Sequence, residues 1–225
     1  ILSALNRNGC PRQIGILVRA TPVRAANTEC FLAGTRIATP GGEVAVESLA
    51  MGDSILTADR RSVAVKWIGR RTVYPRFGFD GRLEPVCISA GALGRGRPHR
   101  DLFVSADHGM VVDGLVINAS ALVNGTTIRF VPAKALPSRI CYFHIETEAH
   151  SVILANGAPA ETFVDYLGRQ AFDNYPEYLA LYGAERVIPE MEHPRISSSR
   201  LLPAAIRARF AGSTPASGSR VTACA

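Results

Sequence analysis

One stretch of the sequence decides the fold: Cys30-Phe-Leu-Ala-Gly-Thr-Arg-Ile-Ala-Thr-Pro-Gly-Gly-Glu-Val-Ala-Val-Glu-Ser-Leu-Ala-Met-Gly-Asp-Ser-Ile-Leu-Thr57. Short apolar runs alternate in it with the turn signals Thr39-Pro-Gly-Gly42 and Gly52-Asp53. Gly, Pro and Asp favour turns because they tolerate or preset the backbone angles of a tight reversal. The same texture continues to residue 165, with short runs at residues 43–46, 54–57, 63–68, 86–89, 102–105 and 111–112 and almost no helical periodicity. The sequence therefore predicts an all-β domain of many short strands.

The segments on either side of this domain differ from it in composition. The chain starts with Ile1 rather than Met, which suggests a fragment or processed form of a longer protein. Helical periodicity first appears between Pro176 and Val187, and a weaker pattern follows at residues 201–210. Ser, Gly, Ala and Thr dominate the last residues. We therefore predict a leader (1–29), the β domain (30–168), a short, partly helical C-terminal extension (169–210) and a disordered tail (211–225).

A spacing pattern recurs 73 residues further along the chain. Ile37-x-x-x-Gly41-x-x-Val44 … Leu49-x-x-Gly52-x-x-Ile55 returns as Met110-x-x-x-Gly114-x-x-Ile117 … Leu122-x-x-Gly125-x-x-Ile128. Each copy is typical of a hairpin with Gly at its turn. Either two β-hairpins resemble each other by chance, or the β fold is duplicated, with pseudo-twofold symmetry and one half of a common site on each copy.

The distribution of charge argues against nucleic-acid binding by the fold. The net charge is +6, but five Arg and no acidic residue lie between His193 and the end, so the first 192 residues carry 20 basic against 19 acidic residues. No apolar run is long enough for a membrane span. The five Cys are an odd number without C-x-x-C spacing, which argues against a disulfide framework or a zinc site and leaves at least one thiol free.

The quoted stretch resembles the opening block of the Hint (hedgehog/intein) domain family, which begins with Cys, continues C-F-x-x-G-T-x-I and then reaches an L-x-x-G-D-x-V/I turn. The resemblance is strongest to a bacterial Hint subfamily whose further blocks are matched in order at residues 65–71, 90–94, 98–108, 122–128 and 142–150. It implies a horseshoe-like domain with pseudo-twofold symmetry over about residues 30–170.

A Cys at the start of such a domain can attack the peptide bond before it. Here the thiol of Cys30 would attack the carbonyl carbon of Glu29, and the amide would rearrange to a thioester with the amine of Cys30 as the leaving group (an N–S acyl shift). The step is uphill because amide resonance is lost. It therefore needs one group that polarises or twists the amide and another that protonates the departing nitrogen.

The resemblance implies that a T-x-x-H block supplies both groups, and its match here is Ser105-Ala-Asp-His108. His108 would contact the amide nitrogen of Cys30 and later protonate the amine. Ser105 keeps the hydroxyl of Thr and would hold the carbonyl oxygen or orient His108.

Two further histidines match late blocks of the family. His150 corresponds to the histidine of the last block and is either functional or a satisfied buried histidine. His144 lies beside Phe143, which occupies the position where many relatives carry Asp, so the role of that acid is either missing or filled by His144.

The residues after Asn156-Gly157 decide between splicing and cleavage. Splicing inteins end in His-Asn followed by Cys, Ser or Thr, whereas this chain reads Ala158-Pro-Ala-Glu-Thr162. Full splicing is therefore not expected, and Thr162 is interpreted as a residue that continues a strand. The predicted function is autocatalytic cleavage at Glu29–Cys30, in which the thioester passes to water, a thiol or another external nucleophile.

No metal or organic cofactor is expected, and the substrate would be the chain's own upstream polypeptide. Two alternatives remain open: a catalytically degenerate Hint domain that serves as a structural or interaction module, and a hydrolase acting in trans with Cys30 and His108. The 23 Arg against two Lys suggest a bacterial origin. Similar bacterial domains belong to exported proteins, whereas a reduced Cys30 favours a reducing compartment, so the localisation is left open.

Overall fold

The computed structural model describes residues 29–77, 83–164, 168–211 and 221. The predicted leader, apart from Glu29, and the predicted disordered tail, apart from Ala211 and Val221, lie outside the described residues. Short strands dominate the described part, and they form two larger sheets and one separate hairpin. The prediction of a mostly β fold is confirmed.

The first sheet contains the strand that directly follows Cys30. Its order is β11 (Ile128–Phe130), β7 (Pro85–Ile88), β8 (Leu102–Ser105), β1 (Phe31–Leu32), β12 (Ile140–Glu146) and β6 (Trp67–Val73). All its pairs are antiparallel. The short strand β1 lies in the middle, where Phe31 pairs with Val104 on one side and with Phe143 on the other.

The second sheet has the order β15 (Arg195–Ile196), β10 (Leu115–Asn118), β9 (Gly109–Val112), β14 (Ala158–Glu161), β13 (Val152–Ala155), β2 (Arg36–Thr39) and β3 (Gly42–Ala45). Only the added edge strand β15 is parallel to its neighbour. The strands β4 (Ser54–Leu56) and β5 (Ser62–Ala64) form the separate hairpin.

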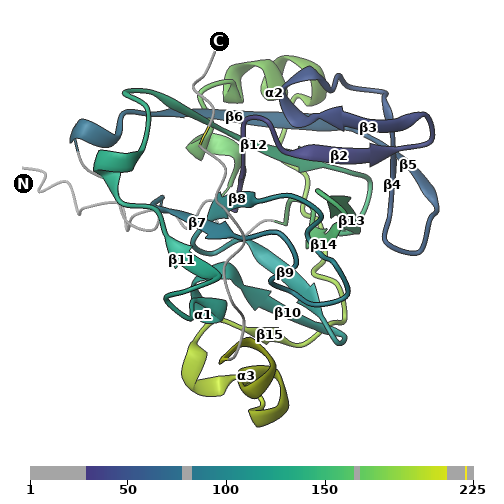
Figure 1. Ribbon diagram of the computed structural model, residues 1–225. Coiled ribbons are helices and arrows are strands. Elements are labelled where there is room, and N and C mark those ends of the chain that lie inside the picture. Colours follow the sequence, from purple (N-terminus) through teal and green to yellow (C-terminus); the bar gives the residue numbers. More distant parts are fainter. Residues whose placement is uncertain (1–28, 78–82, 165–167, 212–220, 222–225) are drawn as a thin grey trace, which may run out of the picture.

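The chain crosses from the first sheet to the second three times, from β1 to β2, from β8 to β9 and from β12 to β13. In Figure 1 the long strands β6 and β12 run across the upper part of the molecule, and β9 and β10 lie below them. The first two crossings follow directly after Leu32 and Ser105. The segments with the predicted catalytic residues therefore meet where the two sheets join.

The repeated sequence pattern corresponds to repeated structure. The first copy forms the hairpin β2–β3, the short helix η1 (Val46–Ser48) and β4, and the second forms β9–β10, α1 (Ala119–Leu122) and β11. The two hairpins flank the central pair β14–β13 of the second sheet. At the turn between β9 and β10, Asp113 and Gly114 have positive φ angles of 50° and 78°, a backbone conformation that Gly adopts without strain. The elements of the two copies thus follow the same order.

Two apolar clusters fill the interior, and β1 contributes to both. Because side chains alternate across a strand, Phe31 packs into the larger cluster, whereas Cys30 and Leu32 point to the other side. The second set, here called the aromatic cluster, consists of Cys30, Leu32, Trp67, Val73, Leu83, Ile140, Tyr142, Phe163, Phe172, Tyr178 and Ile188. The thiol of Cys30 therefore lies in an apolar, aromatic environment.

The C-terminal segments pack onto both clusters. Both predicted helical segments are confirmed as α2 (Tyr175–Tyr182) and α3 (Ala204–Ala211). The former ends before Val187 because Gly183 takes a left-handed φ of 71° and donates its N–H to the Leu179 carbonyl. The remaining short helices are η2 (Pro75–Phe77), η3 (Ala133–Ala135), η4 (Arg169–Ala171) and η5 (Ser199–Leu201). The domain limits at residues 168 and 210 stay a prediction.

None of the helices formed by the described residues is long and apolar enough to cross a membrane.

Candidate functional site

Cys30 is fully buried and lies between the ends of β8 and β12. The Ser105 N–H donates to the Cys30 carbonyl oxygen at 2.9 Å, which extends the β1–β8 pairing by one residue. On the other side, the β1–β12 register pairs Phe31 with Phe143 and therefore aligns Cys30 with His144. Because paired residues of an antiparallel sheet project to the same face, the side chains of Cys30, Ser105 and His144 share one face.

The amide of the predicted scissile bond is held by Ser105. The Cys30 N–H donates to Ser105 Oγ at 2.8 Å, with both residues fully buried. This differs from the predicted arrangement, in which His108 contacts this nitrogen and Ser105 holds the carbonyl oxygen or orients His108. The difference follows from the sheet register, which places the Ser105 side chain directly beside the Cys30 amide. Ser105 is thus the side chain that contacts the amide nitrogen of the predicted scissile bond.

His108 follows in the crossing from β8 to β9. Its N–H donates to the Ser105 carbonyl at 3.1 Å, which closes the Ser105–His108 turn directly after the strand that pairs with β1. The imidazole packs against the Phe31 ring, with centroids 4.2 Å apart. Within the described part of the chain neither ring nitrogen has a hydrogen-bond partner. Burial lowers the pKa of His108 to about 4, so the ring is neutral at pH 7.

His144 lies on the other side of Cys30 and resembles His108 in its surroundings. It is buried, stacks on Phe172 at 6.2 Å between centroids and meets the His108 ring edge-to-face at 5.8 Å. Among the described residues its ring nitrogens also lack hydrogen-bond partners. Burial and the nearby His108 hold the pKa of His144 well below its usual value. Two neutral imidazoles therefore meet here, His144 at the position aligned with Cys30 and His108 against the ring of Phe31, the residue after Cys30. Buried polar groups without partners are uncommon outside functional sites.

The thiol itself is not activated by its surroundings. Burial raises the pKa of the Cys30 thiol well above its ordinary value, and Glu29 raises it further, while Arg71 lowers it less than burial raises it. The thiol is therefore protonated at neutral pH, and a nucleophilic Cys30 requires a base that accepts its proton.

His150 does not share this arrangement, because both of its ring nitrogens are engaged. The Met191 N–H donates to Nδ1 at 3.0 Å, so Nε2 carries the hydrogen and donates to Glu161 Oε2 at 3.1 Å. The geometry is that of a satisfied buried histidine. His150 is connected to the site through Glu161 rather than through Cys30, and its catalytic role stays a prediction.

Sequence reasoning missed a buried polar network beside Cys30 that centres on Glu161. This carboxylate accepts from the Gly109 N–H at 2.5 Å and from the guanidinium of Arg195, which reaches Glu29 Oε1 at 3.4 Å. Burial acts to raise the pKa of Glu161, but the hydrogen bonds from His150 and Arg195 outweigh it and bring the pKa to about 2. The acidic residue in the apolar segment 158–162 was a signal for a buried ion pair, whereas nothing in the sequence pointed to Arg195.

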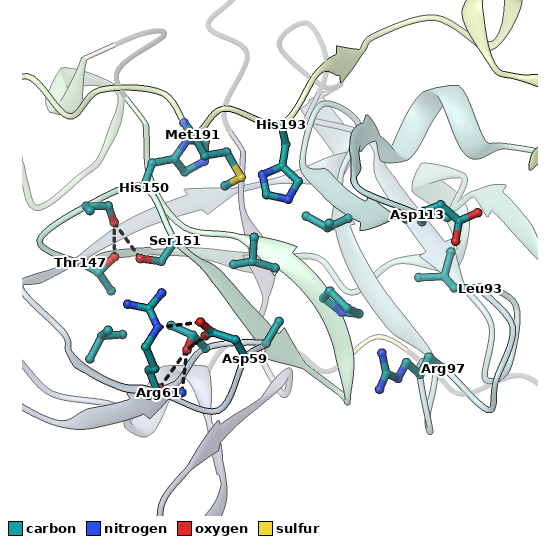
Figure 2. Close-up of a pocket in the computed structure, with 18 of the residues that line it drawn as sticks. Asp59, Arg61, Leu93, Arg97, Asp113, Thr147, His150, Ser151, Met191 and His193 are labelled. Atoms are coloured by element: carbon teal, nitrogen blue, oxygen red, sulfur yellow. Dashed lines mark hydrogen bonds and ion pairs between the residues drawn. The ribbon is translucent and has the colours of Figure 1, made fainter.

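A large cavity lies apart from Cys30. It has a volume of about 870 Å³, and Figure 2 shows it between the turn that carries Asp59 and Arg61 and the segment that carries Met191 and His193. His150 lines it, whereas none of its described lining residues is Cys30, Ser105, His108 or His144. The cavity and the candidate catalytic site are therefore different places in the fold.

The charged groups near the site do not form a metal centre. Across residues 29–77, 83–164 and 168–211, no group of three or more His, Cys, Asp or Glu side chains is placed to hold a metal ion. Cys30 and Cys87 are free thiols, as the cysteine pattern predicted for at least one.

The described residues thus form a two-sheet β fold with a buried Cys directly before its first strand and a Ser-x-x-His turn whose Ser accepts from the amide of that Cys. The model of the Hint domain family matches residues 29–166, which is more than half of the chain. The chain belongs to the Hint domain family. Hint domains act on their own polypeptide, and this membership supports protein self-processing as the general function. The bacterial subfamily stays a prediction.

Solved structures of inteins are similar to this chain at low sequence identity. The MchDnaB-1 intein (N145AA) is 17% identical, with a TM-score of 0.42, over 59% of this chain and 99% of its own. The bacterial intein-like domain from Clostridium thermocellum is 17% identical, with a TM-score of 0.43, over 60% and 99%. The DnaB intein from Synechocystis sp. PCC 6803 is 11% identical, with a TM-score of 0.43, over 61% and 100%. No curated protein sequence matches the chain.

Proposed function

We propose that this domain cleaves its own chain at Glu29–Cys30 by an N–S acyl shift and passes the resulting thioester to water or to another external nucleophile. The observation that carries the proposal is the hydrogen bond from the Cys30 N–H to Ser105 Oγ at 2.8 Å, in a buried position next to two neutral histidines. A scissile amide held by a side chain and flanked by available bases has what the reaction requires.

In the first step, Sγ of Cys30 attacks the carbonyl carbon of Glu29. The S–C bond forms, the C–N bond breaks, and the proton of the thiol ends on the released α-amine of Cys30. The step is therefore neutral in protons overall, and it needs a group that carries the proton from sulfur to nitrogen.

The two histidines suit this transfer because both are neutral. His144 shares the sheet face of Cys30 and would accept the thiol proton. It would pass a proton to His108, whose ring centroid lies 5.8 Å from that of His144, and His108 would then deliver a proton to the departing nitrogen, so that both imidazoles end neutral. Ser105 Oγ fixes the orientation of the amide during this exchange. His144 thereby fills the role of the acid that Phe143 replaces.

In the second step a nucleophile attacks the thioester carbonyl and Cys30 leaves as a thiol. With water the products are an upstream polypeptide that ends in the Glu29 carboxylate and a domain that begins with Cys30. With a thiol or an amine the upstream polypeptide is transferred to that group instead.

Splicing is not part of the proposal because the segment after Gly157 lacks its machinery. Ala158–Glu161 form β14, an interior strand of the second sheet. Thr162 is fully buried, and its hydroxyl accepts from the Ser151 N–H at 2.8 Å. This supports the interpretation of Thr162 as a residue that continues a strand.

The complete burial of Cys30 also argues against a hydrolase acting in trans, because an external peptide would have to reach a thiol inside the aromatic cluster. The alternative of a degenerate Hint domain that serves as a structural module predicts a folded but inert chain.

One experiment separates these functions. A protein tag is fused before residue 1, and the purified fusion is incubated with dithiothreitol at neutral pH. Self-processing gives a thiol-dependent split at Cys30 that Cys30→Ala abolishes and Cys87→Ala, the matched change at the other free buried cysteine, retains. A fusion that unfolds cooperatively but stays intact supports the degenerate domain and overturns the proposal. Cleavage of an added peptide by the intact fusion supports the trans hydrolase.

A further inference from the structure

Arg195 connects the C-terminal extension to the predicted scissile bond. It begins β15, which pairs in parallel with β10 and places Arg195 beside Val116. It also lies outside the region that the Hint domain model matches, residues 29–166. The extension therefore contributes a side chain to the site that the family match does not cover.

The guanidinium of Arg195 lies between two buried carboxyl groups. Nη1 is 3.4 Å from Glu29 Oε1 and 3.2 Å from Glu161 Oε1, and Nη2 donates to the second oxygen of Glu161. The same Nη1 donates to Asn118 Oδ1 at 3.1 Å. Arg195 thus holds Glu161 as a two-pronged ion pair and shares the other N–H of Nη1 between Asn118 and Glu29, while its Nε donates to Glu190 Oε1 at 3.3 Å.

The surroundings of Glu29 make this contact selective. The residue is only 7% exposed, and the side chain of Arg195 is 18% exposed, so neither group is free to exchange its partner for bulk water. The positive charge of Arg195 is already paired with Glu161 and Glu190, and burial followed by the nearby Glu161 raises the pKa of Glu29 well above its usual value, although Arg195 acts to lower it. A side chain at position 29 that offers Arg195 an oxygen therefore satisfies this buried site better than a side chain without an acceptor.

We propose that Arg195 forms a subsite for the residue before the scissile bond and makes self-cleavage selective for a side chain that offers a hydrogen-bond-accepting oxygen at position 29. This inference rests on the proposed function. In physical terms, the contact fixes the side chain of Glu29 and with it the carbonyl carbon that Cys30 must attack, so its loss lowers the rate of the first step.

A purely structural role of Arg195, in which it only neutralises Glu161, gives a different expectation. In that case replacements of Glu29 change the rate by the same factor whether or not Arg195 is present. Selectivity at position 29 that depends on Arg195 is therefore the property to measure.

The test uses the full chain with an upstream tag and the single-turnover rate of thiol-induced cleavage. Gln, Leu and Lys are placed at position 29, because Gln keeps the oxygen, Leu has a similar size without it, and Lys adds a cation next to Arg195. We expect Glu29→Gln to cleave at least about 10-fold faster than Glu29→Leu, since a buried hydrogen bond to a charged group is lost in the latter, and Glu29→Lys to be the slowest. Equal rates for the Gln, Leu and Lys variants would overturn the inference.

The same series is then measured with Arg195→Met, and with Arg200→Met as the matched control, because Arg200 is an exposed arginine of the same segment. The ratio of the Gln to the Leu rate is expected to fall to about 1 with Arg195→Met and to persist with Arg200→Met. A ratio that persists with Arg195→Met overturns the inference, whereas the absence of cleavage in every folded variant overturns the proposed function as well.

A second readout does not depend on cleavage. In the Cys30→Ala chain, melting temperatures are measured for Glu29→Leu, Arg195→Met and the double variant. Arg195→Lys is added because it keeps the positive charge but lacks the planar guanidinium that donates two parallel N–H groups. A non-additive change supports the contact between the two side chains even if the chain does not cleave. Additive changes, or a Glu29→Lys chain as stable as Glu29→Gln, contradict it.

Discussion

Replacing Ser105 with Ala tests the contact on which the proposed mechanism depends most. The change removes the oxygen that accepts the Cys30 N–H at 2.8 Å, and both residues are fully buried, so water does not replace the lost acceptor. A buried donor left without a partner costs about 1–3 kcal/mol, which we expect as a loss in the free energy of unfolding. The rate of cleavage is expected to fall by about 10-fold or more, because each 1.4 kcal/mol of lost transition-state interaction is a factor of ten.

The two effects are measured separately. Stability is measured by urea unfolding in the Cys30→Ala chain, which keeps the backbone N–H but does not react, and cleavage is measured in the tagged chain with Cys30 intact. Ser105→Thr is the matched control, because it retains the hydroxyl and is expected to recover most of the rate. If Ser105→Ala unfolds at the same urea concentration and cleaves as fast as the unmodified chain, the hydrogen bond contributes nothing and the reasoning is refuted.

Three further predictions concern the groups around this contact. The pKa of His108 is about 4 in the folded chain against 6.5 for a free side chain, so its contribution to stability is complete above pH 6.5 and is lost as the pH falls towards 4. The free energy of unfolding falls by about 3 kcal/mol over this range, and His108→Phe should reduce its dependence on pH. An unchanged dependence on pH would contradict the low pKa of His108. Gly109→Ala should destabilise the Cys30→Ala chain by more than about 2 kcal/mol, because a Cβ there would lie 2.2 Å from Glu161 Oε1, and a normal melting temperature would show that this packing is wrong. Asn156→Ala should cost about 2–3 kcal/mol in urea unfolding, since it removes the acceptor of the Arg36 N–H at 2.7 Å and the donor to the Asp101 carbonyl, and a change below 0.5 kcal/mol would argue against both bonds.

The local sequence predicted most of the strands because alternating apolar runs and Gly-Asp turns act over few residues. The predicted runs at 54–57, 86–89 and 102–105 correspond to β4, β7 and β8 within one residue at each end. The run at 63–68 is divided into β5 and β6, because Val65 still bonds Gly52 and Asp53 beside β4, whereas Lys66 donates to the Glu146 carbonyl and begins the pairing with β12. A change of partner set by a segment so distant in sequence as Glu146 has no local signal.

The motifs named the segments of the candidate site, and its catalytic roles stay a prediction. The structure places Ser105 beside Cys30, but which side chain contacts the amide depends on the pairing of β1 with β8, and a sequence does not state that register. The same register explains why His144 rather than Phe143 shares a face with Cys30. Arg195 meets a residue 166 positions before it, and no local pattern in its segment indicates this contact.

The measurement that tests the central claim most directly is the mass of the fragments after incubation of the tagged chain with hydroxylamine. A thioester at Glu29 predicts an upstream fragment that ends in the hydroxamate of Glu29 and a downstream fragment that begins with an unmodified Cys30, and both must be absent from the Cys30→Ala chain. An intact mass for the folded chain, or the same fragments from Cys30→Ala, would contradict the account.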